Sequence, residues 1–318
     1  MQKPPEKQDY SSHPTAAALA LTVPAECAGM RLDQALAKLL PEHSRSRLAQ
    51  WVRDERVHID GRAAAPRAKV WGGEALEVQP TAGPGELAAA PEAIALTVVY
   101  EDAAIIVIDK PAGLVVHPGS GNWSGTLLNA LLAHAPAVGA IPRAGIVHRL
   151  DKETSGLLVV AKTLEAQTDL VRQLQARTVR REYAAIAHGS VARDAKVEAP
   201  IGRHPTSRTR MAVVSRGKPA VTHYRVVERW PDATLLACRL ETGRTHQIRV
   251  HLASIGHPLL GDPVYGKRNV KPALAFHRQA LHAQRLGLTH PVSRKDMSWE
   301  APVPADMQDL IERLRRGA

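Results

Sequence analysis

A carboxylate between two cations is the group in this sequence that could most readily do chemistry. In the stretch GIVHRLDKETSGLLVVAKT, Gly145 to Thr163, Asp151 lies between Arg149 and Lys152 and precedes a Thr-Ser-Gly turn. Apolar runs flank it, so we expect it at the edge of a core. It could form a surface ion pair, cap a turn, or act as a nucleophile beside a cation. A metal ligand is disfavoured, because no second acid or histidine lies at ligand spacing and the neighbouring cations would repel a divalent ion.

A second stretch, LETGRTHQIRVHLASIGHPLLGDPVYG at residues 240–266, is dense in arginine and histidine. Arg244 could supply the cation that an active Asp151 needs. Alternatively, the stretch is a basic surface loop whose histidines are satisfied locally, and the spacing does not choose between the two. His246 and His251 are five residues apart, rather than the four that place two ligands on one helical face, so zinc is disfavoured.

Two further basic stretches contain candidates for contacts with a polyanion. Tyr183 follows several arginines in RTVRREYAAIAHG, where a tyrosine is most often a core residue with its hydroxyl at the edge. The stretch GRHPTSRTRMAVVSRGK, residues 202–218, contains Arg208 and Arg210 among small polar residues. So many cations in this context favour a loop that follows a phosphate backbone over a packed element.

Changes in composition along the chain predict two domains with a tail and a linker. Residues 1–24 are polar and lack periodicity, so we expect a disordered tail. Residues 25–79 form a short unit with helical and strand periodicity, and residues 80–93, rich in Pro, Gly and Ala, form a linker. Residues 94–318 contain many strand-like runs and a few helical ones, which predicts a mixed, mainly antiparallel α+β domain.

The short N-terminal unit is predicted to be a small α/β domain with a basic face. Apolar residues at helical spacing predict two helices separated at Pro41. A hairpin that turns at Asp60 and Gly61 follows, and then a further strand. Arg45 and Arg47 lie on or near the outer face of the second helix, where they could contact phosphates.

Composition favours a polyanionic partner. The 318 residues include 42 Lys and Arg against 31 Asp and Glu, which gives a formal net charge of +11. Each cation that meets a phosphate releases counterions, so nucleic acid is a favoured partner, although a basic protein also gains solubility from its charge. Aromatic residues make up only 3% of the chain, which disfavours a domain that reads single strands by stacking on the bases.

The sequence gives no support for a cofactor or a membrane span. Cys27 and Cys238 are far apart and form no CxxC pair, which predicts a reducing cytoplasm and no zinc site. No apolar run approaches the roughly 20 residues that a membrane helix needs. Neither of the glycine-rich phosphate loops of nucleotide-binding proteins is present, so we expect no nucleotide or other cofactor.

Five stretches resemble the motifs of the RluA-type RNA pseudouridine synthases, and they occur in that family's order. They are HRLDKETSGLLVVAK, REYAAIAHG, GRTHQIRVHL, GDPVYG and RQALHAQRLGLTHP. Residues 30–80 resemble the S4 RNA-binding domain that often precedes this catalytic domain. The resemblance covers nearly everything from residue 25 onward. It implies an enzyme that isomerises uridine to pseudouridine in RNA without a metal, redox or nucleotide cofactor.

The resemblance also implies roles for five residues, by their positions in the motifs. Asp151 would be the nucleophile, and Tyr183 would lie against the target base and help to remove its C5 proton. Arg244 would be the cation paired with Asp151. Ile248 would pack under the base, and Arg149 would enter the space that the uridine leaves when it flips out.

The substrate implied by the resemblance is large-subunit (23S) ribosomal RNA, in the stem-loop of helix 69, modified by a cytoplasmic enzyme that we expect to be a monomer. One alternative is a ribosome-assembly factor that binds RNA through the S4-like unit and has a vestigial active site. The intact set of Asp151, Tyr183 and Arg244 argues against it. The other is a hydrolase with paired carboxylates, which needs a second acid, and the nearest candidate, Glu153, is predicted to face solvent.

Overall fold

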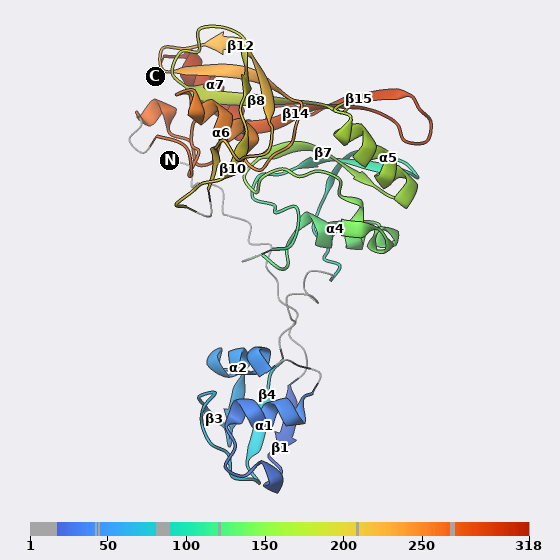
Figure 1. Ribbon diagram of the computed structural model, residues 1–318, viewed down its shortest axis with the longest axis vertical. Coiled ribbons are helices and arrows are strands. Elements are labelled where there is room, and N and C mark those ends of the chain that lie inside the picture. The colour runs from blue at the N-terminus through green and yellow to red at the C-terminus, as the bar shows by residue number, and fades with distance from the viewer. Residues whose placement is uncertain are drawn as a thin grey trace. The chain divides into compact units, whose positions relative to one another are not determined.

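The computed structural model describes residues 18–41, 43, 45–80, 90–119, 122–207, 210–267 and 271–317. This part of the chain divides into two compact units, one that ends at Ala90 and one that begins at Pro91 (Figure 1). We call them the N-terminal and C-terminal units. Most of the predicted linker, residues 80–93, lies outside the described residues. Within these ranges, no helix has the length and apolar character needed to cross a membrane.

The N-terminal unit is a small antiparallel sheet packed against two helices (Figure 1). The strand order is β1-β4-β2-β3, and all three pairs are antiparallel. The elements are β1 (Leu19–Thr22), the 3-10 helix η1 (Ala25–Cys27), α1 (Leu32–Leu39), α2 (Arg45–Arg53), β2 (Val57–Ile59), β3 (Arg62–Ala63) and β4 (Ala75–Val78). The predicted α/β unit is confirmed.

Local sequence patterns account for these elements. Leu32 and Leu36 lie one helical turn apart in α1 and are both fully buried. Leu76 is buried between exposed neighbours in β4, as the period of a strand requires. The predicted hairpin turn is present, since Asp60 and Gly61 both have positive φ, 48° and 73°, which an Asp-Gly pair adopts readily.

The N-terminal boundary of this unit differs from the predicted one. We expected a disordered tail over residues 1–24, of which residues 1–17 lie outside the described part of the chain. Leu19–Thr22, however, forms β1 and pairs along its whole length with β4, so the prediction is wrong for these residues. Leu19 and Leu21 pack against the core of the unit. Two alternating leucines are too short a pattern to identify a strand from sequence.

The C-terminal unit is built on a nine-stranded sheet with the order β5-β6-β7-β14-β8-β13-β12-β9, and β15 also pairs with β14 (Figure 1). Only β7 and β14 run parallel; the other pairs are antiparallel, which confirms the predicted mixed, mainly antiparallel class. The strands of this sheet are β5 (Thr97–Glu101), β6 (Ile105–Lys110), β7 (Ser155–Ala161), β8 (Arg180–His188), β9 (Ala195–Glu198), β12 (Val221–Arg229), β13 (Ala233–Leu240), β14 (Leu281–Thr289) and β15 (Asp296–Glu300).

Helices and a small hairpin complete the C-terminal unit. The hairpin consists of β10 (Ile201–Arg203) and β11 (Met211–Val213). The helices are α4 (Leu127–His134), η2 (Pro136–Ala140), η3 (Pro142–Gly145), α5 (Leu164–Gln175), α6 (Gln247–Ser254), η4 (Pro272–Leu274) and α7 (Ala305–Arg315). α4 and α5 form in the stretches GTLLNALLAHA and EAQTDLVRQLQAR, two of the helical runs expected in residues 94–318. The sequence of the stretch that contains α6 is also compatible with a surface loop. Residues 247–252 are all buried, so α6 lacks the amphipathic pattern that identifies a helix.

Strand β7 is buried on both faces. Its residues alternate between two hydrophobic cores: Leu158 and Val160 belong to one, and Leu157 and Val159 to the other. A strand covered on both faces cannot shift by one residue without placing each set in the wrong core. β7 therefore fixes the segment that precedes it, which contains Asp151.

Gly156 provides a test of how closely β7 is held. Its φ is +111°, and a Cβ at this position would collide with the backbone of Ala283 on β14. We expect Gly156→Ala to destabilise the C-terminal unit by about 2–4 kcal/mol in denaturant unfolding followed by circular dichroism. Gly113→Ala is the matched control, since Gly113 also has a positive φ, +90°, but nothing lies within 4 Å of an added Cβ. It should cost about 1 kcal/mol. Equal costs would contradict the close approach of the two strands.

Candidate active site

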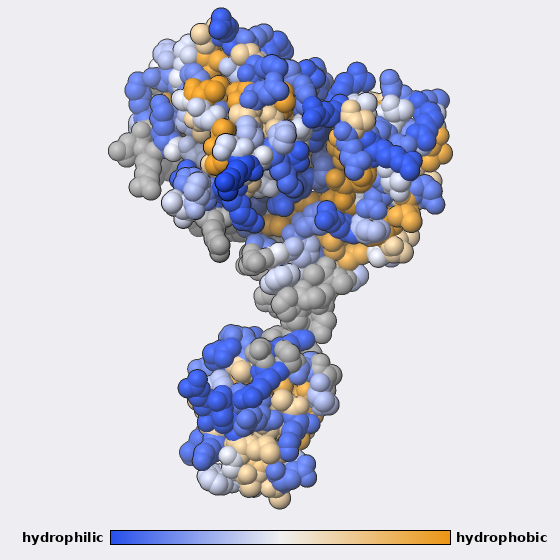
Figure 2. Space-filling view, in the orientation of Figure 1, coloured by the Kyte–Doolittle hydropathy of each residue, from blue (hydrophilic) through white to orange (hydrophobic). Residues whose placement is uncertain are grey.

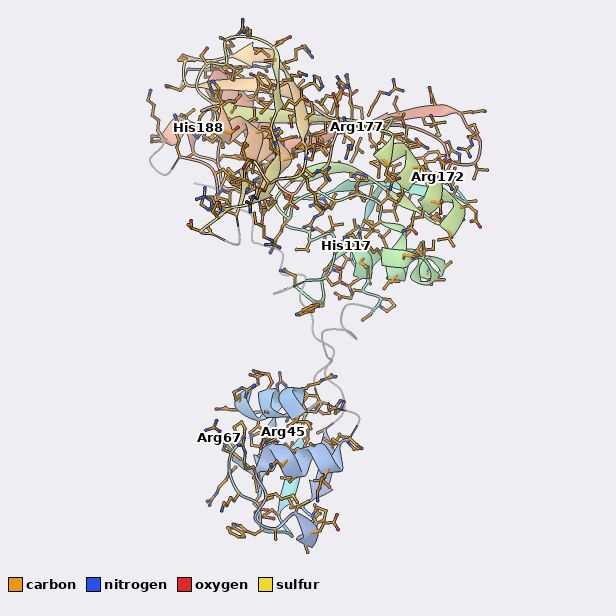
Figure 3. The ribbon with its side chains drawn as sticks, in the orientation of Figure 1. Arg45, Arg67, His117, Arg172, Arg177 and His188 are labelled. Atoms are coloured by element: carbon orange, nitrogen blue, oxygen red, sulfur yellow. The ribbon has the colours of Figure 1, made fainter. Side chains whose placement is uncertain are left out.

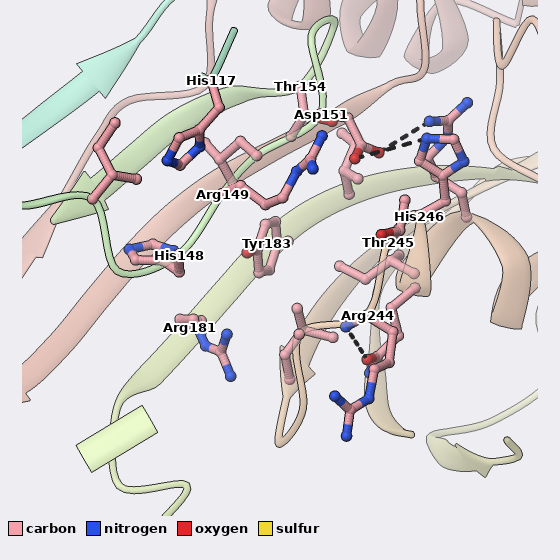
Figure 4. Close-up of a pocket in the computed structure, with 18 of the residues that line it drawn as sticks. His117, His148, Arg149, Asp151, Thr154, Arg181, Tyr183, Arg244, Thr245 and His246 are labelled. Carbon is pink, nitrogen blue, oxygen red and sulfur yellow. Dashed lines mark hydrogen bonds and ion pairs between the residues drawn. The ribbon is translucent and has the colours of Figure 1, made fainter. Parts of the chain in front are cut away.

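A cavity of ≈590 Å³ in the C-terminal unit brings together the residues that the sequence singled out (Figure 4). Asp151, Tyr183, Arg149, Arg244 and Ile248 all line it. Its described wall contains five arginines and one carboxylate, that of Asp151. A cleft lined by cations with low-dielectric walls attracts anions, so the cavity suits a polyanionic substrate.

Asp151 is paired with Arg249 and not with Arg244. Nη1 of Arg249 donates to Oδ2 of Asp151 at 3.0 Å. Arg244 instead donates from Nε to the carbonyl oxygen of Pro219 at 3.1 Å. The prediction that Arg244 is the cation paired with Asp151 is therefore wrong. Both arginines belong to one short motif, and α6 begins between them, so spacing alone could not show which one faces the carboxylate.

A second carboxylate, that of Asp262, binds the guanidinium nitrogens of Arg249 that do not face Asp151. Nε and Nη2 of Arg249 donate to the two oxygens of Asp262 at 2.7 and 2.9 Å. The side chains of Arg249 and Asp262 are 4% and 0% exposed, against 16% for Asp151. Burial alone would lower the pKa of Arg249, but the hydrogen bonds and charge of Asp262, with the charge of Asp151, raise it. The guanidinium is therefore charged and fixed in orientation, with Nη1 directed at Asp151.

His246 is the second group near the Asp151 carboxylate (Figure 4). Its Nε2 lies 3.9 Å from Oδ1 of Asp151, and its Nδ1 lies 2.9 Å from the hydroxyl of Tyr265. That hydroxyl also accepts the N–H of Met211 at 2.9 Å. Burial lowers the pKa of His246 more than Asp151 raises it, so the ring is neutral near pH 7.

Lys110 fixes the backbone that follows Asp151. Its Nζ donates to the carbonyl oxygen of Lys152 at 3.1 Å, and the N–H of Gly113 donates to the same oxygen at 2.9 Å. Lys110 is fully buried at the end of β6. Burial lowers its pKa to about 7, although the charges of Glu153 and Asp151 act in the opposite direction. A buried lysine thus satisfies backbone carbonyls that a loop at this depth could not expose to water.

Arg278 holds the next residues of the same segment. It is 1% exposed, and its Nη1 donates to the carbonyl oxygen of Glu153 at 3.1 Å. Asp306 on α7 accepts two further hydrogen bonds from it, at 2.7 and 2.9 Å. Gln279 donates to the hydroxyl of Thr154 at 3.1 Å. Side chains from distant parts of the sequence therefore hold residues 152–154 in one position.

A left-handed turn leads into the segment from the other end. Arg143, Ala144 and Gly145 have consecutive positive φ values of 56°, 51° and 75°. A Cβ at Gly145 would collide with the carbonyl oxygen of Ala161, the last residue of β7. Non-glycine residues keep such conformations only where the surrounding structure imposes them. The turn places Arg143 on the cavity wall.

Tyr183 lies on β8, between Cys238 of β13 and Ala283 of β14. Burial raises its pKa; the charge of Arg181 opposes the rise and that of Asp151 adds to it. The side chain therefore stays a neutral phenol. In Figure 4 it lies between Asp151 and Arg181.

None of the other predicted RNA-binding residues of known placement lines this cavity. The guanidinium of Arg210 is centred 5.4 Å from the ring of Tyr265, and Arg208 lies outside the described residues. Arg47, in the N-terminal unit, stacks its guanidinium 5.2 Å from the ring of Trp51. These contacts leave the roles of Arg47 and Arg210 in RNA binding as predictions.

A basic groove in the N-terminal unit contains Arg45 (Figure 3). Arg31, Arg53 and Arg67 line it as well, with Asp33 as a counter-charge. Arg45 donates twice to one oxygen of Asp33, at 3.0 and 2.9 Å. Figure 2 shows mostly hydrophilic residues around α2 on the visible face. Four arginines against one carboxylate suit contacts to a phosphate backbone.

His251 is a satisfied core residue. It is fully buried, and its ring nitrogens lie 2.9 Å from the hydroxyl of Thr222 and 3.0 Å from the carbonyl oxygen of Ala199. Among the residues of known placement, no group of three or more His, Cys, Asp or Glu is arranged to hold a metal ion.

Comparison with known proteins decides the family. The model of the RNA pseudouridylate synthase family matches residues 104–254, and that of the S4 domain matches residues 30–75. The ribosomal large subunit pseudouridine synthase D of Nitrosomonas europaea is 57% identical, over 97% of this chain and 94% of its own. The chain belongs to the RNA pseudouridylate synthase family.

Further relatives of this synthase support the same family. The protein of the same name from Neisseria meningitidis serogroup A is 56% identical, over 93% of this chain and 82% of its own. The solved structure of human RNA pseudouridylate synthase domain containing 1 superposes with a TM-score of 0.54 at 26% identity, over 70% of this chain and 96% of its own. The likeness to enzymes of this class therefore extends to sequence and to fold.

Several charged residues of the synthase that position its cavity were not singled out from the sequence. They are Lys110, Arg181, Arg249, Asp262 and Arg278. All except Lys110 lie inside stretches that resemble family motifs. A charged residue inside such a stretch is the signal that could have identified these four.

Proposed function

We propose that this synthase converts uridines of large-subunit ribosomal RNA to pseudouridine, with Asp151 as the nucleophile. The names of the relatives and the match to the S4 domain support the RNA substrate. The observation that carries the proposal is the hydrogen bond of 3.0 Å from buried Arg249 to Asp151, in a cavity whose described lining contains no other carboxylate. A hydrolase with paired carboxylates needs two acids there.

The isomerisation has a simple balance of bonds and protons. The N1–C1′ bond breaks, the base turns, and a C5–C1′ bond forms; the proton on C5 leaves and N1 gains one. No electron is gained or lost overall. A carboxylate suits this task, because it can attack carbon and later depart. Attack of Asp151 on C1′, attack on C6 and a glycal route are all compatible with this geometry.

The cavity also suits a flipped base. A base must leave its stack before it reaches Asp151, which costs a few kcal/mol. Ile248 and Tyr183 are buried and provide an apolar wall against which the base can lie. Arg149 is exposed on the cavity wall, where it can occupy the place of the departed base. Because Tyr183 is a neutral phenol, we propose that it contacts the base and helps to transfer the C5 proton.

We extend the proposal to the stem-loop of helix 69 as the target. A nucleotide in a loop costs less to flip than a paired one, so a stem-loop suits an enzyme of this kind. Ribosomal RNA as substrate implies action in the cytoplasm. We further expect a monomer, since the residues proposed for chemistry come from one chain.

Asp151→Asn tests the nucleophile. Asparagine keeps the shape of the side chain but cannot form and release an ester, so we expect tritium release from C5-labelled uridine to fall below about 10⁻³ of the native rate. The substrate is bacterial large-subunit rRNA, and sequencing of the modified positions identifies the uridines. Glu153→Gln is the control: the Glu153 side chain does not line the cavity, so release should persist.

Two outcomes would contradict this assignment. Undiminished release by Asp151→Asn would exclude the nucleophile. Binding of the RNA without release by the native protein would favour an RNA-binding assembly factor.

The basic groove predicts a salt-dependent contribution from the N-terminal unit. We expect the pair Arg53→Ala and Arg67→Ala to raise KM with little change in kcat, because phosphate contacts position the RNA and take no part in the chemistry. The slope of log K against log salt should become shallower by about one for each arginine. Arg62→Ala, on β3 and outside the groove, is the control. An unchanged KM and slope in the double variant would remove the groove from RNA binding.

A further inference from the structure

One buried arginine of the cavity has no counter-ion among the residues that the structure describes. Arg181, on β8, is 6% exposed and lines the cavity. In the described part of the chain its side chain makes no hydrogen bond or ion pair, and its Nε is buried without a partner. Arg249, in the same cavity, has two carboxylates. A buried, uncompensated cation is costly, and arginine cannot lose its proton to avoid that cost.

The surroundings of Arg181 leave the guanidinium unneutralised. A Cβ on Gly243 would lie 2.9 Å from its Nη1, so the guanidinium lies beside a backbone that has no side chain. His148 is near as well. Burial, and then the charge of Arg181, lower the pKa of His148 to about 3, so that ring is neutral. Its Nε2 accepts the N–H of Val159 at 3.1 Å.

We propose that Arg181 binds a phosphodiester adjacent to the flipped uridine. The inference rests on the proposed function and adds a ligand for this residue. The phosphodiester is the anionic group that RNA presents before any bond breaks, and the planar fork of arginine matches two of its oxygens. Figure 4 shows Arg181 on the far side of Tyr183 from Asp151. We place the base against Tyr183 with its reacting carbons toward Asp151, and a phosphate of the same nucleotide toward Arg181.

The proposal distinguishes a binding role from a structural one. A structural arginine stabilises the free protein, whereas an uncompensated one destabilises it until its ligand binds. We therefore expect Arg181→Gln to have a Tm equal to or above that of the native protein without RNA. A Tm lower by several degrees would indicate a structural role and overturn the proposal.

The decisive experiment removes one charge from the RNA and one from the protein. The probe is a stem-loop RNA with the target uridine, prepared with normal linkages or with an uncharged methylphosphonate on the 5′ or the 3′ side of that uridine. Kd is measured for the native protein and Arg181→Gln. We expect Arg181→Gln to bind the normal RNA about 10- to 100-fold more weakly. One of the two methylphosphonates should weaken native binding similarly, yet have little further effect on Arg181→Gln.

Matched variants sharpen this test. Arg180→Gln removes the preceding, exposed arginine of β8 and should leave the dependence on the linkage unchanged. Gly243→Ala displaces the guanidinium while keeping its charge, and it should reduce the penalty of the same methylphosphonate. If each methylphosphonate weakens Arg181→Gln as much as it weakens the native protein, the proposal is wrong.

A different result would assign Arg181 to the chemical step. Unchanged Kd, with a loss in the single-turnover rate of tritium release, would mean that it stabilises the detached uracil anion, which overturns phosphate binding. The Kd comparison does not depend on turnover. Absence of tritium release by the native protein would therefore defeat the proposed function without deciding the ligand of Arg181.

Discussion

A buried guanidinium shared by two carboxylates is the interaction on which the active site depends. Asp262 fixes two nitrogens of Arg249, and the third is directed at Asp151. Taking these charges out of water costs several kcal/mol, which good geometry only offsets, so the group contributes orientation more than stability. A charge already in place needs no reorganisation during the reaction, which is how fixed electrostatic groups lower a barrier.

The scaffold also fixes the orientation of Asp151, because it removes the conformational freedom that a polar loop would otherwise have. The segment that carries Asp151 begins at a left-handed turn and ends in β7, which is buried on both faces. Between them, Lys110 and Arg278 donate hydrogen bonds to its backbone carbonyls. Arg181 differs from these two, because among the residues of known placement its buried Nε has no hydrogen-bond partner. A buried cation without a partner lowers stability, and an anionic ligand would restore it.

Much of this could be predicted from sequence, and the failures have physical reasons. Periodicity identified the two helices and the hairpin of the N-terminal unit, and motif residues such as Asp151 and Tyr183 do meet in one cavity. Two alternating leucines could not identify β1, and the uniformly buried α6 lacked an amphipathic pattern. The prediction of Arg244 instead of Arg249 as the partner of Asp151 failed for a local reason. His246 adopts a left-handed conformation, with φ 56°, at the start of α6, and the direction of a helix after such a residue cannot be read from spacing.

The most direct test of this account compares Arg249→Gln with Arg244→Gln. The measurement is the single-turnover rate of tritium release from C5-labelled uridine at saturating enzyme, with RNA affinity and Tm as checks on folding. Arg249→Gln should lower the rate by about 100-fold or more, because it removes the charge fixed beside Asp151. Arg244→Gln should lower it by less than about tenfold, since Arg244 contacts Pro219 and not the carboxylate. A native rate in a folded Arg249→Gln variant, or a larger loss in Arg244→Gln, would contradict the account.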